Sequence, residues 1–328
     1  MNDLFSLGLH MYRMGYIGNG MIDPVYVDNV EFFNDWKTKL DRFTNFLLNE
    51  KGCSKNKIKS DLDFIQGVKT LTSKVNYSYP NNNFIAFSGG IDSLVSYLIM
   101  KEDRSPTMPM LYFWNHEQDQ IKHELKSLEH FEKRLGIDVL KFNVNPDSLG
   151  CSKETNFGWK LGDFKIPARN FVLVSFPTMF INHDCNIGLG AYKGEIMNKN
   201  RDKSKRFFKF CSELFSDYFN KEIKVYSPVG KMAKSEEIDY LYNHGIDIGE
   251  TRTCITGNKD PCGKCKPCFN LWVAIENSNF SDGFGITNLY RRRIKRSKIL
   301  DYYKKNLNNY PLERRKEISK AINSLRRK

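Results

Sequence analysis

A glycine-rich turn between an apolar run and a predicted helix constrains the fold of this chain most strongly. Phe84 to Phe87 form a short apolar run bounded by turn residues, which predicts a buried strand of a parallel sheet. The next residues are Ser88-Gly89-Gly90-Ile91-Asp92-Ser93, where the two glycines turn the chain. Leu94 to Met100 continue as an apolar stretch that can form a helix. This order predicts the beginning of an α/β unit.

The same alternation of strand and helix recurs along the chain. Strands are predicted at 84–87, 109–114, 139–144, 186–190 and 224–228, and helices at 94–100, 121–135 and 170–181. Strands that alternate with helices pair in parallel, because a helix connects the end of one strand to the start of the next. The sequence therefore predicts an α/β, Rossmann-like fold, with a parallel five-stranded sheet and helices on both faces.

The turn after the first strand has the composition of an anion-binding loop. Glycines let the backbone approach an anion closely, and N–H groups at the start of a helix face that anion. Ser88 and Ser93 add hydroxyl donors, while Asp92 is suited to Mg²⁺ or to orienting the loop. A Walker-type P-loop is excluded because the Gly-Lys-Ser/Thr ending is absent. The alternative is an ordinary strand–helix turn that happens to carry an aspartate.

Four of the eight cysteines crowd into one short segment. They are Cys254, Cys262, Cys265 and Cys268. This spacing, with Gly263 and Pro267 in the turns, suits a tetrahedral Zn²⁺ site. Four thiolates close the coordination sphere, so we expect a structural metal, and an iron–sulfur cluster is the alternative. The other four are interpreted as small core residues: Cys53, Cys151, Cys185 and Cys211.

Two further segments carry candidate binding residues. Ile166 to Asn170 precede an apolar helix, and Arg169 could hold a phosphate or a carboxylate as a fork-shaped donor. This pattern is also typical of an ordinary helix start after a proline. His116, His123 and His130 recur every seven residues. They lie on the polar face of the predicted helix, which favours a solvated surface over a metal triad.

The basic character of the chain is concentrated at its C-terminal end. Residues 290–328 hold fifteen Lys or Arg and three Asp or Glu, which leaves the rest of the chain close to neutral. Such a segment can contact the phosphate backbone of tRNA or DNA, or an acidic protein. A solvated amphipathic helix is the alternative, because Ile318, Ile322 and Leu325 follow helical spacing.

Nothing in the sequence indicates a membrane or a secreted protein. No apolar stretch reaches the roughly 18 residues that span a bilayer. The first residues lack the basic start and apolar run of a signal peptide. A cytoplasmic location is therefore expected, where cysteines are free thiols or metal ligands.

The segment Ser88 to Ser93 resembles the PP-loop of the N-type ATP pyrophosphatases, which cleave ATP between the α- and β-phosphates. These enzymes include asparagine and NAD synthetases, tRNA thiolases and 7-cyano-7-deazaguanine synthase. Together with Ala168-Arg169-Asn170, Lys234 and the four cysteines, the order of motifs is similar to that of the 7-cyano-7-deazaguanine synthases over roughly residues 82–275. The resemblance implies the adenine nucleotide alpha hydrolase-like variant (HUP) of the Rossmann-like fold.

The resemblance also implies a chemistry. Such an enzyme adenylates the carboxylate of 7-carboxy-7-deazaguanine, ammonia gives the amide, and a further activation gives the nitrile. ATP, Mg²⁺ and Zn²⁺ would be its cofactors, and a homodimer is left open. By resemblance, the catalytic residues are Ser88, Asp92, Arg169 and Lys234. The ATP-binding residues are Phe87, Ser88, Gly89, Gly90, Asp92, Ser93, Arg169, Asn170 and Gly190.

The half of the site that would hold the acceptor departs from this family. Its acidic Tyr-Pro-Asp segment is replaced by Gly190 to Met197, which includes Tyr192 and Glu195, and another motif is replaced by Trp114 to Gln118. Relatives in phage-defence operons, and others that attach a deazaguanine acid to a protein amine, diverge similarly. Two alternatives therefore stay open: an enzyme that modifies a base in tRNA or DNA, and a non-catalytic nucleotide-binding subunit.

These motifs suggest a division of the chain into four parts. Residues 1–80 form an N-terminal helical extension of unknown role, and residues 81–250 form the ATP-binding domain. Residues 251–285 hold the cysteines, and residues 286–328 form the basic helical tail.

Overall fold

A computed structural model of the chain describes residues 2–17, 24–49, 61–66, 83–103, 107–114, 118–144, 168–197, 201–254 and 261–325. In chain order, its strands and α-helices are α1 (Asp3–Ile17), β1 (Val25–Val27), α2 (Val30–Leu48), β2 (Phe64–Gln66), β3 (Asn83–Ala86), α3 (Ile91–Glu102), β4 (Thr107–Trp114), α4 (Gln118–Leu135), β5 (Leu140–Val144), α5 (Arg169–Ser175), β6 (Cys185–Leu189), α6 (Lys193–Met197), α7 (Lys205–Phe219), β7 (Ile223–Tyr226), α8 (Lys234–Asn243), α9 (Lys266–Asn277), α10 (Thr287–Lys295), α11 (Lys298–Lys305) and α12 (Leu312–Ser324).

The larger sheet has five parallel strands in the order β5-β4-β3-β6-β7. The strand that precedes the glycine-rich turn, β3, lies in the centre, and its Ala86 pairs with Met110 of β4 and Leu189 of β6. The strand order reverses between β3 and β6, and ligands of such folds bind at the carboxyl ends of the strands at this switch point. The predicted parallel five-stranded α/β sheet is confirmed.

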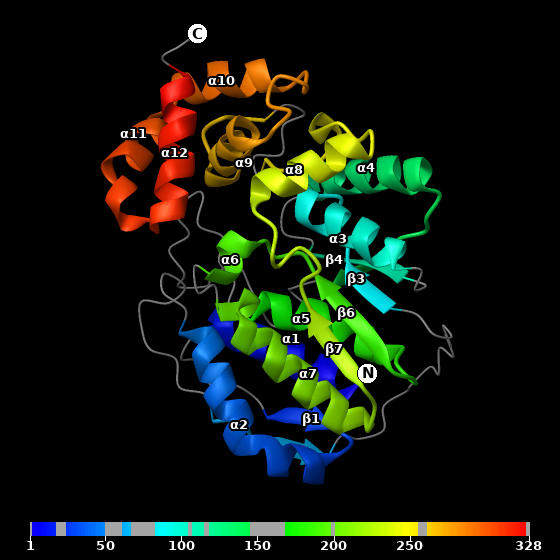
Figure 1. Cartoon of the computed structure of the whole chain (residues 1–328). Helices are drawn as coiled ribbons and strands as arrows, with labels where there is room; N and C mark the ends of the chain where they lie inside the picture. Colours follow the sequence, from blue (N-terminus) through cyan, green and yellow to red (C-terminus); the bar gives the residue numbers. More distant parts are fainter. Residues whose placement is uncertain are drawn as a thin grey trace.

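Helices cover both faces of this sheet, as predicted (Figure 1). Successive side chains of a strand point to opposite faces. In β3, Phe84 therefore enters a core with residues of α1, α2, α5 and α7, whereas Ile85 enters a core with residues of α3, α4, α8 and α9. The central strand thus contributes to both cores.

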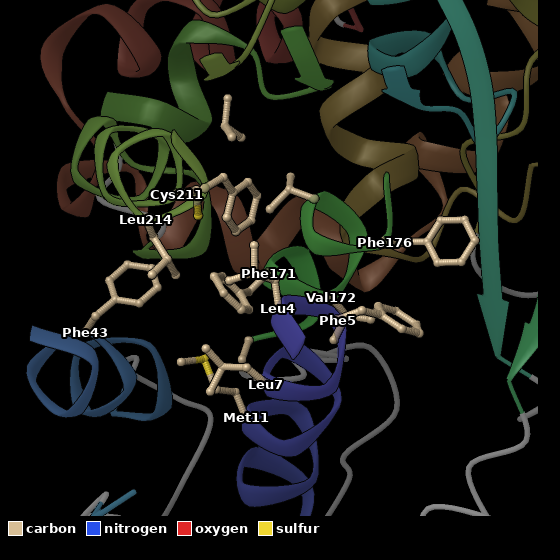
Figure 2. Close-up of a cluster of buried hydrophobic side chains, with 14 of the residues drawn as sticks. Leu4, Phe5, Leu7, Met11, Phe43, Phe171, Val172, Phe176, Cys211 and Leu214 are labelled. Atoms are coloured by element: carbon tan, nitrogen blue, oxygen red, sulfur yellow. The ribbon is translucent and has the colours of Figure 1, made fainter. Parts of the chain in front are cut away.

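The N-terminal segment packs onto one face of the sheet. Leu4, Leu7 and Met11 of α1 lie in the same buried cluster as Phe171 of α5 (Figure 2). The ring of Phe43 in α2 also stacks on a ring of α7, Phe210, with centroids 3.7 Å apart. Besides helices, this segment contains a small parallel sheet of β1 and β2.

An aspartate of α1 connects parts of this segment to one another and to α7 by hydrogen bonds. The carboxylate of Asp3 accepts from the backbone N–H groups of Asp28 and Asn29, at 2.9 and 3.1 Å, and from the hydroxyl of Tyr218 in α7 at 2.9 Å. Residues 2–66, so far as they are described, therefore share a core with α5 and α7. The predicted boundary at residue 80 stays a prediction.

The C-terminal helices pack on α9, the helix that begins at the cysteine segment. The ring of Tyr303 in α11 stacks on Phe269 in α9, with centroids 3.8 Å apart and planes 10° apart. Ile294 of α10 and Ile318 of α12 are fully buried in the same core. These apolar positions of the basic segment are thus used for packing, and some of its charged residues, such as Arg291 and Arg314, also form ion pairs.

One predicted element is shorter than expected. The apolar helix predicted at 170–181 ends as an α-helix at Ser175 and continues as a 3₁₀ turn over Phe176–Met179. Pro177 has no backbone N–H to donate, and its ring interferes with the preceding helical turn. The prediction of one continuous helix was wrong for this reason.

Candidate ATP site and metal centre

The turn between β3 and α3 has the geometry of an anion-binding loop. Gly89 adopts φ +70°, a conformation that glycine takes without steric cost, and Gly90 caps the N-terminus of α3. The hydroxyl of Ser93 accepts from the backbone N–H of Ser88 at 3.2 Å and donates to the carbonyl of Gly90 at 2.9 Å. Ser93 therefore shapes the loop, while Ser88 is exposed at its mouth.

A second glycine lets the loop after β6 approach this turn. A Cβ atom at Gly190 would lie 2.8 Å from the backbone carbonyl carbon of Asp92 and 2.8 Å from its Cβ. Any other residue at Gly190 would force the two segments apart. The structure thus brings Gly190 against the loop, as the resemblance implies.

A lysine from α8 bridges two carboxyl groups behind the loop. The ammonium of Lys234 forms an ion pair with Asp92, and it donates to Oε2 of Glu237 at 3.0 Å. Lys234 and Asp92 are far apart in the sequence, so only the tertiary fold brings them together. Two predicted catalytic residues are therefore in contact.

Burial and charge set the protonation states of Asp92, Lys234 and Glu237. Burial raises the pKa of Asp92, but the charges of Lys234 and Lys203 and the hydrogen bonds of the carboxylate together lower it to about 2. Burial and the charge of Asp92 hold the pKa of Glu237 well above its usual range. Burial lowers the pKa of Lys234, but the two carboxyl groups outweigh this and raise it. The Asp92–Lys234 pair is thus fully charged at neutral pH.

A second ion pair lies next to the first. The ammonium of Lys203 contacts the carboxylate of Glu195 at 2.9 Å, and both side chains are largely buried. Burial raises the pKa of Glu195, the charge of Lys203 lowers it, and the charge of Asp92 raises it again. The segment that departs from the family, 190–197, thus faces the same electrostatic environment as Asp92.

The remaining predicted residues, Arg169 and Asn170, approach this network from α5. The side-chain amide of Asn170 donates to Asp202 at 2.8 Å, and the charge of Arg169 lowers the pKa of Asp202 against the larger effect of burial. Ala168, just before the helix, has φ +60°, which is uncommon for a residue with a Cβ. A strained residue at a helix start often marks a site where a side chain is held in place.

Sequence reasoning missed several charged residues of this network. They are Glu237, Lys203, Asp202 and Arg314. One signal was available for Glu237, because a carboxylate three residues after a lysine lies on the same face of a helix. Arg314, from the basic segment, acts on the buried hydroxyl of Tyr192: burial raises the pKa of this phenol, and the charge of Arg314 opposes the shift. Nothing in the local sequence indicates that contact.

The four cysteines of the predicted metal site lie together. Their sulfur atoms are all within 4.8 Å of one another, and those of Cys262 and Cys268 are 3.9 Å apart. Thiolates bound to one Zn²⁺ at about 2.3 Å in a tetrahedron lie about 3.8 Å apart, so the donors fit a single ion. Cys265 caps α9, and Arg293 of α10 donates to the carbonyl of Pro261. The segment is therefore held between two helices.

The described residues hold no other group of His, Cys, Asp and Glu side chains that could bind a metal ion. Near the loop, Asp92, for which the sequence predicts either Mg²⁺ binding or a role in orienting the loop, is paired with Lys234. Mg²⁺ at nucleotide sites needs few protein ligands, because phosphates and water supply the rest. Of the seven-residue histidine series, only the side chain of His130 lies within the described residues. Its Nε2 contacts Glu250 at 2.6 Å and it is half-exposed, which agrees with a surface role.

Comparison with known proteins decides the family. Residues 82–277 match the family model of the queuosine biosynthesis protein QueC, which is more than half of the chain. The chain belongs to the QueC family. The matched range contains the glycine-rich loop, Lys234 and all four clustered cysteines, whereas α1, α2 and α10 to α12 lie outside it.

Relatives of the QueC-family chain are distant in sequence. It is 25% identical to the 7-cyano-7-deazaguanine synthase of Methanosarcina mazei, over 60% of this chain and 94% of that protein. It is 28% identical to the enzyme of the same name from Methanococcus vannielii, again over 60% and 94%. Among solved structures, the U34-tRNA thiolase NcsA from Methanococcus maripaludis, with its [4Fe-4S] cluster, is similar at a TM-score of 0.37 and 16% identity, over 66% of this chain and 72% of that one.

Among the helices of the described residues, none combines the length and the apolar composition needed to cross a bilayer.

Proposed function

We propose that this QueC-family protein is an ATP-dependent carbon–nitrogen ligase that adenylates a carboxylate resembling that of 7-carboxy-7-deazaguanine. The observation that carries the proposal is the turn from Ser88 to Ser93 at the carboxyl end of the central strand, with the Asp92–Lys234 ion pair beside it. The relatives from Methanosarcina mazei and Methanococcus vannielii are named 7-cyano-7-deazaguanine synthases.

The loop supplies the binding half of this chemistry. Backbone N–H groups at the start of α3 and the exposed hydroxyl of Ser88 would hold phosphate oxygens. Lys234 would offset negative charge on the departing pyrophosphate, together with Mg²⁺ at Asp92. Phe87, Arg169 and Asn170 are proposed to complete the ATP site.

The reaction balances as two displacements. A carboxylate oxygen of the acceptor attacks the α-phosphorus, the bond to the β-phosphate oxygen breaks, and pyrophosphate leaves. Ammonia then attacks the activated carbonyl carbon, AMP leaves with the bonding electrons, and a proton is lost to solvent, which gives the amide. A second adenylation of the amide, followed by loss of AMP and a proton, would give the nitrile.

We further propose that the cysteine segment holds structural Zn²⁺. A closed set of four thiolates within 4.8 Å of one another supports one ion rather than an iron–sulfur cluster, whose thiolates bind separate irons. Cys254 and Cys268 lie in the same core as Phe87 and Leu94, so the metal would stabilise the core behind the loop.

The test is mass spectrometry of ATP reactions with 7-carboxy-7-deazaguanine, with and without ammonia. We expect AMP and pyrophosphate rather than ADP and phosphate, and an amide or nitrile product when ammonia is present. An AMP adduct that persists with ammonia would indicate another nucleophile, such as a protein amine. Absence of AMP with any deazapurine would rule out the substrate class and favour a base in tRNA or DNA.

A further inference from the structure

One carboxyl group beside the ATP site has no role in the chemistry above. Glu237 of α8 is fully buried, and its Oε2 accepts from Lys234. Its other oxygen, Oε1, has no hydrogen-bond partner among the described residues. A buried polar atom without a partner is unfavourable and calls for an explanation.

Stability does not explain this residue. The other buried residues of α8 are Ile238 and Leu241, and both pack in the core that contains α3 and α9. A leucine at position 237 would continue this apolar face. Replacing both members of a buried ion pair by well-packed apolar residues is often neutral or stabilising, whereas removing one member alone is costly. An apolar pair would thus serve stability as well, and the retained Glu237–Lys234 pair points to a role at the site.

Glu237 interacts with Lys234 on its own helix and also with Asp92 of the loop. Glu237 and Lys234 stand three positions apart at the start of α8, on one face of the helix. Asp92, the other partner of the lysine, belongs to α3 and to the phosphate loop. An ammonium has three donors, so Lys234 can keep Glu237 while its other N–H groups change partner.

We propose that Glu237 is a positioning residue that keeps Lys234 at the phosphate site while ATP replaces Asp92 as its partner. This inference rests on the proposed function, because it needs a nucleotide at the loop. In the proposed site Asp92 binds Mg²⁺, so Lys234 exchanges that carboxylate for a phosphate oxygen. A lysine side chain is flexible, and one fixed partner on its own helix restricts the conformations that it samples before ATP binds. Oε2 of Glu237 is the acceptor that the ammonium keeps when it turns away from Asp92.

The experiment compares two substitutions at one position. Glu237→Leu removes both acceptors for Lys234, whereas Glu237→Gln keeps an amide oxygen that can accept from the ammonium. The measurement is the affinity for α,β-methylene-ATP with Mg²⁺ by calorimetry, with no deazapurine present. We expect about tenfold weaker binding for Glu237→Leu, and binding close to that of the wild type for Glu237→Gln.

A matched control separates positioning from the general effect of a buried carboxylate. Glu276 is also buried and pairs with Arg291 at 2.5 Å, but it lies on α9 among the C-terminal helices. Glu276→Gln should leave the affinity for the ATP analogue unchanged. Thermal melting shows whether each variant is folded, and Glu237→Met provides a second apolar variant if Glu237→Leu does not fold.

Two results would overturn the inference. One is an apolar variant that binds the ATP analogue as tightly as the wild type, and the other is Glu237→Gln binding as weakly as Glu237→Leu. A wrong substrate assignment would be seen separately, as a wild type that binds the analogue but forms no AMP with any deazapurine. The ratio of affinities between the variants does not depend on that outcome.

Discussion

The cysteine cluster and the charged group at Asp92 differ in how the chain assembles them. The four cysteines lie within fifteen residues of sequence, and their sulfur atoms gather within 4.8 Å. Asp92, Lys234 and Glu195 come from three separate elements, and the Asp92–Lys234 contact joins residues 142 positions apart. A local cluster forms wherever its own segment folds, whereas a long-range cluster exists only when the whole sheet and its helices are in place.

This difference indicates that one region contributes to stability and the other to activity. The cysteine cluster is closed and lies in a hydrophobic core with α3 and α9, so its contribution should be to stability. The charged group lies at the carboxyl edge of the sheet, where the loop and α6 meet, so its contribution should be to activity. Substitutions in the two regions should therefore separate folding from catalysis.

The largest expected effect is that of removing one thiolate. Cys265→Ser should abolish tight metal binding and much of the stability of residues 261–325, since structural zinc contributes about 10–16 kcal/mol in small zinc domains. Elemental analysis for zinc and iron, with thermal melting by circular dichroism, provides the measurement. We expect one zinc for each wild-type chain and none in the variant.

Cys211 is the matched control for this prediction. It is a fully buried thiol in α7, remote in sequence from the cluster. Cys211→Ala should keep one zinc for each chain. Iron in the wild type, or a Cys265→Ser variant that melts at the wild-type temperature, would contradict the assignment of a structural zinc.

The next effect should appear in activity rather than in folding. Asp92→Asn should lower the rate of AMP formation by about 10²–10³-fold, as when one electrostatic contact to a transition state is lost. The variant should stay folded, although its melting temperature at neutral pH should fall, because the ion pair with Lys234 is lost. Glu213→Gln, a surface substitution on α7, should leave the rate unchanged. A variant that retains the wild-type rate would remove Asp92 from the proposed machinery.

The same aspartate gives a pH signature of stability. The pKa of Asp92 in the folded protein is about 2, below the ordinary value of 3.8. A lowered pKa means that its stabilising contribution is present above about pH 4 and is lost as the pH falls toward 2. Asp92→Asn should remove that part of the acid dependence, as measured by denaturant unfolding at several pH values. Identical acid profiles for the two proteins would argue against the Asp92–Lys234 pair.

The smallest effect is expected from the exposed cations of the C-terminal helices. Lys295, Arg296 and Lys298 are exposed near the junction of α10 and α11. If this surface contacts a nucleic acid backbone, replacing all three by glutamine should weaken tRNA or duplex DNA binding. For duplex DNA, the slope of log affinity against log salt should fall by about 0.9 for each lost contact.

A triple variant elsewhere controls for net charge. Lys205, Lys209 and Lys221 are exposed at and near α7. Their replacement should leave nucleic acid binding nearly unchanged. Equal effects of the two triple variants would show that binding follows total charge, and no effect of either would show that the basic segment is a solvated surface.

Much of the fold could be predicted from local patterns. All five predicted strands are present in the main sheet, because buried parallel strands are short, continuous apolar runs that stand out between turns. The helix predicted at 170–181 failed at Pro177, where a proline outweighed the apolar pattern. The role of residues 1–80 could not be predicted, because their apolar residues identify a helix face but not the surface that covers it.

The sequence by itself determined the glycine-rich loop, the cysteine cluster and the strands of the sheet, because each of these depends on residues that are close together in the chain. Which strands pair, such as β3 with β6, was decided by the tertiary structure. Only the tertiary structure decided which charges surround Asp92: Lys234 and Glu237 from α8, and Lys203 beside Glu195. Ion pairs between distant elements depend on how those elements pack. The spacing of residues along the chain does not indicate that packing. The pKa values and the partners of the catalytic lysine therefore come from the fold.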